Sequence, residues 1–371
     1  GWIYMRKILK NIFKAVMVLG VSAAFIAAYN IYRDNSTEDI ASVIEANEVA
    51  MVESADDSNI SSSGRRIISW GDSITYGLGS GDGIVNVDGD SVDISDWAYT
   101  DALEYFTGLD VYNLGVCSET SYEIALRQGG LAMYVDKAVT VRAGKSSKIN
   151  IVDAYGNKVE LQNFNGYASY NDEPENLVYI DNAPYQLTYN NGSWYISFYD
   201  TETTGSVKIK KNSQVVTQAA HDIADTASDV LIIQMGSNGG WDDYDMLISQ
   251  YKAMIANSGT QCYIIIGDTD NPDEAIDSEN YNSSKEVGLN DTLWEAALRE
   301  AFGDHFINMR TYLMQNALDI TGKEANETDI ENLLDGRIPD SIKYDYTHLN
   351  GYGYYAYGVG VYEKGVELGY W

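Results

Sequence analysis

The sequence has little cysteine and few positive charges for its length. Only two cysteines, Cys117 and Cys262, occur in 371 residues, which excludes a scaffold held by several disulfides and a zinc site built from several thiolates. The two form either one disulfide or two separate buried thiols. There are 24 Lys and Arg against 55 Asp and Glu, a formal net charge of −31. Because this charge repels a phosphate backbone, we expect no nucleic-acid partner.

The amino-terminal segment holds the long apolar run of the chain. Basic residues between Arg6 and Lys14 precede an uncharged stretch over 15–32, and acidic residues follow from Asp34. This order predicts export, with residues 1–33 as either a cleaved signal peptide or a membrane anchor. Residues 34–64 are acidic and lack aromatic residues, which predicts a disordered stalk. We therefore expect an extracellular or cell-surface protein of bacterial type that meets a membrane only through this segment.

From residue 65 onward, short apolar segments alternate with segments of helical periodicity. Strands are expected at 67–69, 111–114, 230–234, 262–266 and 305–308. Helices are expected at 95–106 with Ser95 as the cap, and at 120–127, 244–256, 291–302 and 354–368. Strands that are apolar throughout and separated by helices indicate a parallel sheet covered on both faces. The sequence therefore predicts an α/β fold.

Residues 131–216 follow a different pattern, with a period of two that is typical of strands. Trp194, Ile196 and Phe198 alternate with more polar residues, and Asn190-Asn191-Gly192 separates two such runs, which predicts a hairpin. We expect a small β-rich domain inserted into an α/β domain formed by residues 65–130 and 217–371. The aromatic residues of this segment either pack within its sheet or stack on sugars; they include Tyr167, Tyr170, Tyr195 and Tyr199.

Four short polar segments lie at the ends of predicted strands or before the last helix. They are Gly-Asp-Ser-Ile-Thr at 71–75, Asn-Leu-Gly at 113–115, Gly-Ser-Asn-Gly at 236–239 and Asp-Tyr-Thr-His at 345–348. The carboxyl ends of parallel strands meet at one edge of a sheet, where open α/β folds bind their ligands. We therefore expect the four segments to meet at this edge.

In this order, the four segments resemble those of the SGNH hydrolases, also called GDSL-type esterases. The resemblance covers most of residues 65–371 outside the β-rich segment. It implies a flavodoxin-like three-layer α/β/α sandwich and a serine esterase. Carried over to this chain, it implies Ser73 as the nucleophile, with Asp345 and His348 completing a catalytic triad. It also implies an oxyanion hole formed by Ser73, Gly115 and Asn238.

The residue types suit the roles that the resemblance implies. A serine hydroxyl needs a base to take its proton, and an imidazole titrates near neutral pH. Asp345, three residues before His348, can hold one imidazole tautomer. Backbone N–H groups of Ser73 and Gly115 and the side-chain amide of Asn238 would stabilise a developing oxyanion. The chain departs from the family at Gly239, where the family often has an aspartate.

We therefore expect a secreted or surface-anchored serine esterase that removes acyl groups, above all acetyl groups, from a carbohydrate. The expected partner is an acylated glycan, and no cofactor or metal is expected. The other histidines, His221 and His305, are expected to be structural. Two alternatives stay open: a hydrolase of lipid or aryl esters, and a glycan-binding surface protein whose hydrolase body is inactive. The sequence leaves the oligomeric state open.

Overall fold

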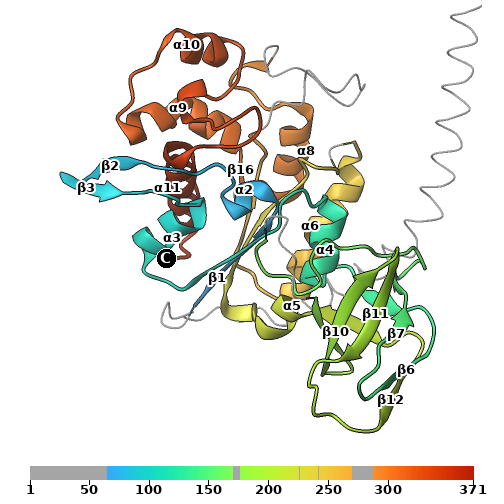
Figure 1. Ribbon diagram of the computed structural model, residues 1–371. Helices are drawn as coiled ribbons and strands as arrows, with labels where there is room; N and C mark the ends of the chain where they lie inside the picture. The colour runs from blue at the N-terminus through green and yellow to red at the C-terminus, as the bar shows by residue number, and fades with distance from the viewer. Residues whose placement is uncertain (1–64, 170–175, 225, 241, 270–286) are drawn as a thin grey trace, which may run out of the picture. The chain divides into compact units, whose positions relative to one another are not determined.

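The computed structural model describes residues 65–371, apart from 170–175, 225, 241 and 270–286 (Figure 1). The predicted signal or anchor at 1–33, the predicted stalk at 34–64 and Tyr170 all lie outside the described residues. Among the residues that are described, no helix combines the length and the apolar character needed to cross a bilayer.

A five-stranded parallel sheet forms the centre of the α/β part. Its strands lie in the order β16 (Phe306–Ile307), β15 (Tyr263–Ile266), β14 (Val230–Gln234), β1 (Ile67–Gly71) and β4 (Val111–Gly115). Numbered along the chain and read from β4, this order is 2-1-3-4-5. The chain first places β4 beside one edge of β1 and then crosses to place β14 beside the other edge. The prediction of an α/β fold with a parallel sheet is confirmed.

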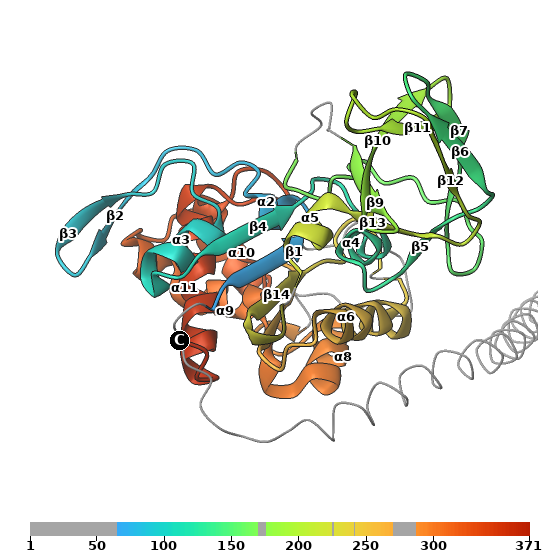
Figure 2. The same cartoon turned by 90° about the horizontal axis from the view of Figure 1, so that it is seen from below.

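Both faces of this sheet are apolar because successive side chains of each strand enter two different cores. In β14, Val230 and Ile232 belong to one core, whereas Leu231 and Ile233 belong to the other. Helices cover both faces (Figure 2). The first core takes residues from α3 (Tyr99–Thr107), α9 (Met309–Thr321) and α11 (Gly351–Glu367). The second takes residues from α4 (Ser121–Gln128), α6 (Tyr244–Ser258) and α8 (Leu293–Phe302).

The chain between α4 and β14 forms a second sheet with antiparallel strand pairs. Its seven strands lie in the order β7 (Ser147–Ile149), β11 (Ser193–Phe198), β10 (Ala183–Asn190), β9 (Leu177–Ile180), β13 (Gln214–Thr217), β5 (Met133–Val135) and β8 (Ile151–Asp153). A separate pair joins β6 (Val139–Arg142) to β12 (Ser206–Ile209). This sheet packs around a hydrophobic core that includes Val178 and Ile196, and α4 adds Leu126 to it. The prediction that this segment is rich in strands is confirmed.

The predicted hairpin at 190–192 is also confirmed. Asn190 of β10 pairs with Ser193 of β11, which leaves a two-residue loop. Asn191 and Gly192 in this loop have φ values of +47° and +73°. Positive φ at both positions is typical of a type I′ hairpin loop, and asparagine and glycine tolerate it best.

The structure corrects the start of the first long helix. The prediction began this helix near a Ser95 cap, but α3 begins at Tyr99 with Ala98 in the capping position. The Ser95 hydroxyl instead donates to the Asp93 carboxylate at 2.6 Å, at the end of a hairpin that the sequence pattern did not reveal. That hairpin pairs β2 (Ile84–Val87) with β3 (Asp90–Asp93).

Some shorter elements and one long helix were not predicted either. They are α2 (Ser73–Tyr76), α9 and α10 (Glu327–Leu334); a further short helix, α5 (Gln218–Asp222), contains His221. Cys117 and Cys262 are both buried and not bridged. Of the two possibilities left open for the cysteines, the structure therefore shows two separate thiols.

Candidate active site

Ser73 lies at the carboxyl edge of the parallel sheet, two residues after the end of β1, which lies between β14 and β4. It is the first residue of α2, a short helix that the preceding Asp72 caps by accepting the N–H of Ile74 at 3.0 Å. The Tyr76 N–H donates to the Asp72 carbonyl at 3.0 Å, and the Gly77 N–H donates to the Ser73 carbonyl at 3.1 Å. These bonds fix the turn that presents the serine side chain at the end of the strand.

The structure brings Ser73, His348 and Asp345 into one hydrogen-bonded line. His348 Nε2 lies 2.9 Å from Ser73 Oγ, although the two residues are 275 positions apart in the sequence. His348 Nδ1 lies 2.9 Å from Asp345 Oδ2 and 3.0 Å from Asp345 Oδ1. Asp345 Oδ1 also accepts the backbone N–H of His348 at 2.7 Å and of Thr347 at 2.9 Å. The turn between the two residues therefore holds the carboxylate against the imidazole.

The Asp345 carboxylate is ionised near neutral pH, although its environment acts in two directions. Burial acts to raise its pKa, but the hydrogen bonds from the His348 backbone and ring and from the Thr347 backbone outweigh burial, and the pKa is lowered from its usual value. An ionised carboxylate beside Nδ1 favours the tautomer with its proton on Nδ1. In that tautomer the lone pair of Nε2 faces Ser73 Oγ and can accept the hydroxyl proton.

Asn238 lies in the turn after β14, the strand next to β1, and is exposed. Its Nδ2 donates to the Glu119 carbonyl at 3.2 Å. A side-chain amide carries two N–H donors, so this bond leaves one of them for a ligand. The Ser73 N–H is a further donor, because no acceptor for it lies among the described residues. Both groups fit the oxyanion role that the resemblance implies.

Gly115 differs from the expectation that its N–H is an oxyanion donor. This N–H donates to Asn113 Oδ1 at 3.0 Å and so already has an acceptor within its own strand. A Cβ atom at Gly115 would lie 2.1 Å from the Tyr76 N atom. The structure therefore needs glycine here so that α2 can pack closely on the end of β4, and it does not support an oxyanion role for this N–H.

Ser118 is a candidate donor that the sequence did not reveal. It lies three residues beyond the end of β4, is exposed and has a φ of +66°. Its N–H finds no acceptor in the described part of the chain. The adjacent residue is Glu119, whose carbonyl binds the Asn238 amide. A glycine would have signalled this left-handed backbone, whereas a serine gives no such signal.

A buried carboxyl group lies behind the nucleophile. Asp72, directly before Ser73, has no exposed surface. Burial raises the pKa of Asp72 to about 7, and the negative charge of Asp268 adds to the effect. The protonated form of this side chain therefore persists to higher pH than that of an exposed aspartate. The capping bond to Ile74 exists in either form, because one carboxyl oxygen remains an acceptor.

The other two histidines lie in structural surroundings. His221 stacks on Tyr179 with ring centroids 3.5 Å apart, and His305 stacks on Tyr263 with centroids 4.0 Å apart. In the described ranges, no three His, Cys, Asp or Glu residues are grouped so that they could hold a metal ion. No family model, curated protein or solved structure matches the chain.

Proposed function

We propose that this protein is a serine esterase of the SGNH type, with Ser73, His348 and Asp345 as its catalytic triad. Ser73 Oγ attacks the ester carbonyl carbon while His348 Nε2 takes the hydroxyl proton. The alcohol leaves with that proton, and an acyl-serine remains. A water molecule then attacks the acyl-serine with His348 again as the base, which releases the carboxylic acid and restores Ser73. The Ser73 N–H and the Asn238 amide would stabilise the oxyanion in both steps.

The observation that carries this proposal is the unbroken line from Asp345 through His348 to Ser73. Both contacts of the imidazole measure 2.9 Å at their closest, and they use its two different nitrogens. A serine that served only as a helix cap would need no imidazole within hydrogen-bonding distance of its hydroxyl. A histidine with only a structural role would need no serine hydroxyl beside its Nε2. The pattern of nucleophile, base and orienting acid is the one that activates a serine hydroxyl.

The proposed fold family agrees with the order of the parallel strands. An order of 2-1-3-4-5 with helices on both faces supports a flavodoxin-like three-layer sandwich. In such sheets the ligand lies beyond the carboxyl ends of the strands where the order reverses, which here are β1 and β14. Ser73 and Asn238 follow these two strands. The separate core of the β-rich segment supports the view that residues 131–216 are an inserted domain.

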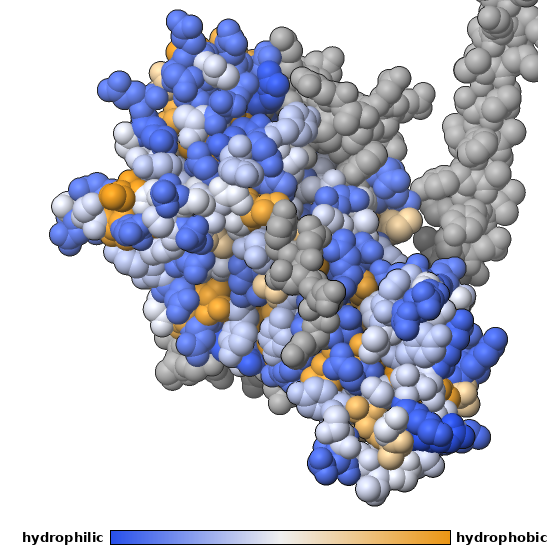
Figure 3. All heavy atoms as spheres, viewed as in Figure 1, coloured by the Kyte–Doolittle hydropathy of each residue, from blue (hydrophilic) through white to orange (hydrophobic). Residues whose placement is uncertain are grey.

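For the substrate we propose an acylated carbohydrate, with acetyl as the acyl group. Tyr344 and Tyr346 flank Asp345 and are 64% and 49% exposed, so aromatic surface lies beside the triad. Tyrosine rings have an apolar face that can stack on a sugar ring and a hydroxyl that can bind it. On the face shown in Figure 3, the described hydrophobic residues form small separate patches. That surface favours a sugar substrate over a long acyl chain, which needs a wider apolar surface.

The experiment compares acetate release from acetylated xylan with hydrolysis of para-nitrophenyl octanoate, for the wild type and for Ser73→Ala. We expect acetate release by the wild type only, and a higher kcat/KM for para-nitrophenyl acetate than for the octanoate. A preference for octanoate without acetate release from the polysaccharide would contradict the proposed substrate. Equal activity of the two proteins would contradict the proposed mechanism.

A further inference from the structure

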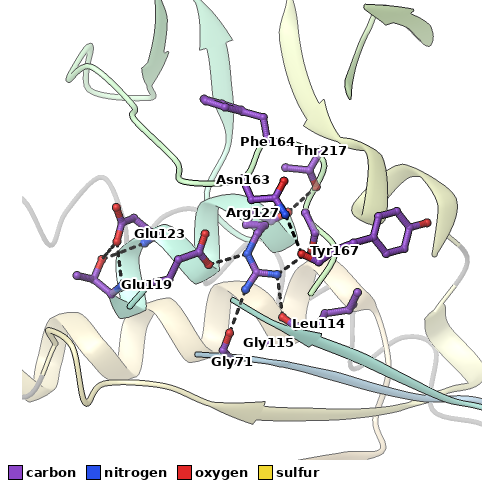
Figure 4. A network of polar contacts seen from close by, with 12 residues as sticks. Gly71, Leu114, Gly115, Glu119, Glu123, Arg127, Asn163, Phe164, Tyr167 and Thr217 are labelled. Atoms are coloured by element: carbon purple, nitrogen blue, oxygen red, sulfur yellow. Dashed lines mark hydrogen bonds and ion pairs between the residues drawn. The ribbon is translucent and has the colours of Figure 1, made fainter. Parts of the chain in front are cut away.

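A buried arginine joins three parts of the chain behind the candidate active site (Figure 4). The side chains of Arg127 in α4 and Glu119 have no exposed surface, and Arg127 Nε lies 2.6 Å from Glu119 Oε2. The guanidinium also lies over the ring of Trp70, 5.1 Å from the ring centroid. It is therefore packed as well as ion-paired, and its orientation is fixed.

The other guanidinium nitrogens bind backbone carbonyls of three separate segments. Arg127 Nη2 donates to the Gly71 carbonyl at 3.0 Å, at the end of β1 and two residues before Ser73. Arg127 Nη1 donates to the Leu114 carbonyl at 2.8 Å, near the end of β4. Nη1 also donates to the Gly166 carbonyl at 2.9 Å, in the β-rich segment. One planar group therefore holds the nucleophile turn, the end of the neighbouring strand and a loop of the β-rich segment together.

Glu119 extends this network to the oxyanion amide. Its carboxylate binds Arg127, while its backbone carbonyl accepts the Asn238 amide at 3.2 Å. The position of Glu119 therefore decides how the Asn238 side chain is oriented. The end of β13, which follows the β-rich segment, is bound to the same residue, because the Thr217 hydroxyl donates to the Arg127 carbonyl at 2.7 Å.

Such a pair is better suited to fixing geometry than to adding stability. Removing two charges from water costs about as much as their attraction returns, so a buried ion pair contributes little net stability. A planar guanidinium, however, has five donors at fixed angles and can hold several acceptors at once. Small displacements matter at such a site, because a shift of about 1 Å at the reacting groups can cost about a hundredfold in rate.

We propose that Arg127 and Glu119 are positioning residues, which set Ser73 and Asn238 for the reaction and tie the β-rich segment to that geometry. The proposal rests on the proposed esterase function for its kinetic consequence. Its structural consequence, that the segments held by Arg127 and Glu119 become less rigid when the ion pair is lost, does not depend on that function. Neither residue touches the substrate, so their loss should lower kcat and leave KM nearly unchanged.

The test uses Glu119→Gln, which keeps the size of the side chain and an oxygen that can accept from Arg127 Nε, but removes the charge. Glu295→Gln is a matched control. Glu295 pairs with Arg310 at 2.6 Å, and these side chains are 7% and 3% exposed. The further contacts of Arg310 are within its own region, to the Gly288, Asn290 and Gly336 carbonyls and to Met314. The control therefore has the same chemistry, and among the described residues the hydrogen bonds of Arg310 do not include Ser73, Asn238, Asp345 or His348.

For Glu119→Gln we expect at least about a tenfold lower kcat on para-nitrophenyl acetate, with KM within about twofold of the wild type. Glu295→Gln should leave kcat and KM within about twofold of the wild-type values. This expectation holds even if either variant shifts the midpoint of unfolding in urea. Arg127→Lys keeps the charge but cannot span three carbonyls, so it should resemble Glu119→Gln. Wild-type kcat in a folded Glu119→Gln, or an equal loss in Glu295→Gln, would overturn the proposal.

Hydrogen exchange gives a readout that does not need activity. In Glu119→Gln, peptides covering residues 71–78, 163–169 and 235–240 should exchange faster than in the wild type, and in Glu295→Gln they should not. Unchanged exchange would overturn the inference. An inactive wild type that shows this pattern would reject the proposed function and retain the inference. If Glu119→Gln and Arg127→Lys both fail to fold while Glu295→Gln folds, the pair serves stability and the proposal is overturned.

Discussion

Replacing Asp345 by asparagine changes the one side chain that orients the His348 imidazole. Asp345 Oδ1 accepts two backbone N–H groups of its own turn and lies 3.0 Å from His348 Nδ1, whereas Oδ2, at 2.9 Å from Nδ1, has no other partner in the described part of the chain. An asparagine would keep its oxygen in the Oδ1 position to preserve the backbone bonds, and would place its NH₂ opposite His348 Nδ1. The NH₂ group would favour an Nδ1 that accepts, with the ring proton on Nε2, while the oxygen 3.0 Å from Nδ1 would still allow the other tautomer in part of the population. With the ring proton on Nε2, this nitrogen cannot take the proton of Ser73.

The size of the loss depends on how exposed the carboxylate is. Where the triad aspartate is buried, this replacement lowers kcat about 10⁴-fold. Here the Asp345 side chain is 46% exposed, so water can compete for Nδ1 and let part of the population keep the productive tautomer. We therefore expect a loss of about 10²- to 10³-fold, which corresponds to about 3 to 4 kcal/mol in the activation free energy.

The assay is steady-state hydrolysis of para-nitrophenyl acetate, with circular dichroism and urea unfolding to show that the variant is folded. The kcat of Asp345→Asn should fall by the stated factor, while KM changes little. Asp345→Ala is the matched control, because it removes the carboxylate without placing a donor opposite Nδ1. A folded Asp345→Asn with a kcat within about threefold of the wild type would refute the proposed role of this aspartate.

Three further predictions test other parts of the structure. Asn238→Ala should lower kcat about 10²- to 10³-fold with little change in KM, and an unchanged kcat would remove this amide from the oxyanion site. Because the pKa of Asp72 is raised from 3.8 to about 7 in the folded state, the folded protein binds more protons than the unfolded chain, and its free energy of unfolding should fall as pH rises across that range. Urea unfolding at several pH values should show a flatter dependence for Asp72→Asn, and an equal slope would contradict the assignment. Cys117 and Cys262 are unbridged and buried, so a thiol reagent should find two thiols per chain in unreduced, unfolded protein and almost none in folded protein; no thiols after unfolding would indicate a disulfide.

The three residues that the structure brings into one hydrogen-bonded line were predictable because each has a chemical signal at a recognisable place. Ser73 follows an apolar strand, and Asp345 and His348 lie three residues apart before a helix. The role of Gly115 could not be judged in the same way. Its N–H is taken by the side chain of Asn113, and a hydrogen bond between residues two apart depends on the local backbone angles rather than on the residue types. For the same reason, the residue types do not predict the left-handed φ of Ser118.

The elements of the fold differ in how clearly the sequence shows them. The strand at 230–234 was predicted with its observed bounds because all its residues are buried and the first four, Val230 to Ile233, are apolar on both faces. Helix α9 carries a helical signal, with Asn308 as its cap and Leu313 and Ala317 buried four residues apart. The β2–β3 hairpin carries almost none, because Val85 is the one buried residue in its two strands. Such exposed strands are set by their turn and their packing against other elements, which a local pattern does not contain.

The central claim is that the Ser73 hydroxyl is an activated nucleophile. The most direct test is labelling of the purified protein with a fluorophosphonate probe, followed by mass spectrometry to locate the modified residue, with Ser73→Ala and His348→Ala alongside the wild type. The account predicts one label per chain, on Ser73, lost in Ser73→Ala and strongly slowed in His348→Ala. A folded wild type that is not labelled, or a label on another serine that survives in Ser73→Ala, would contradict it.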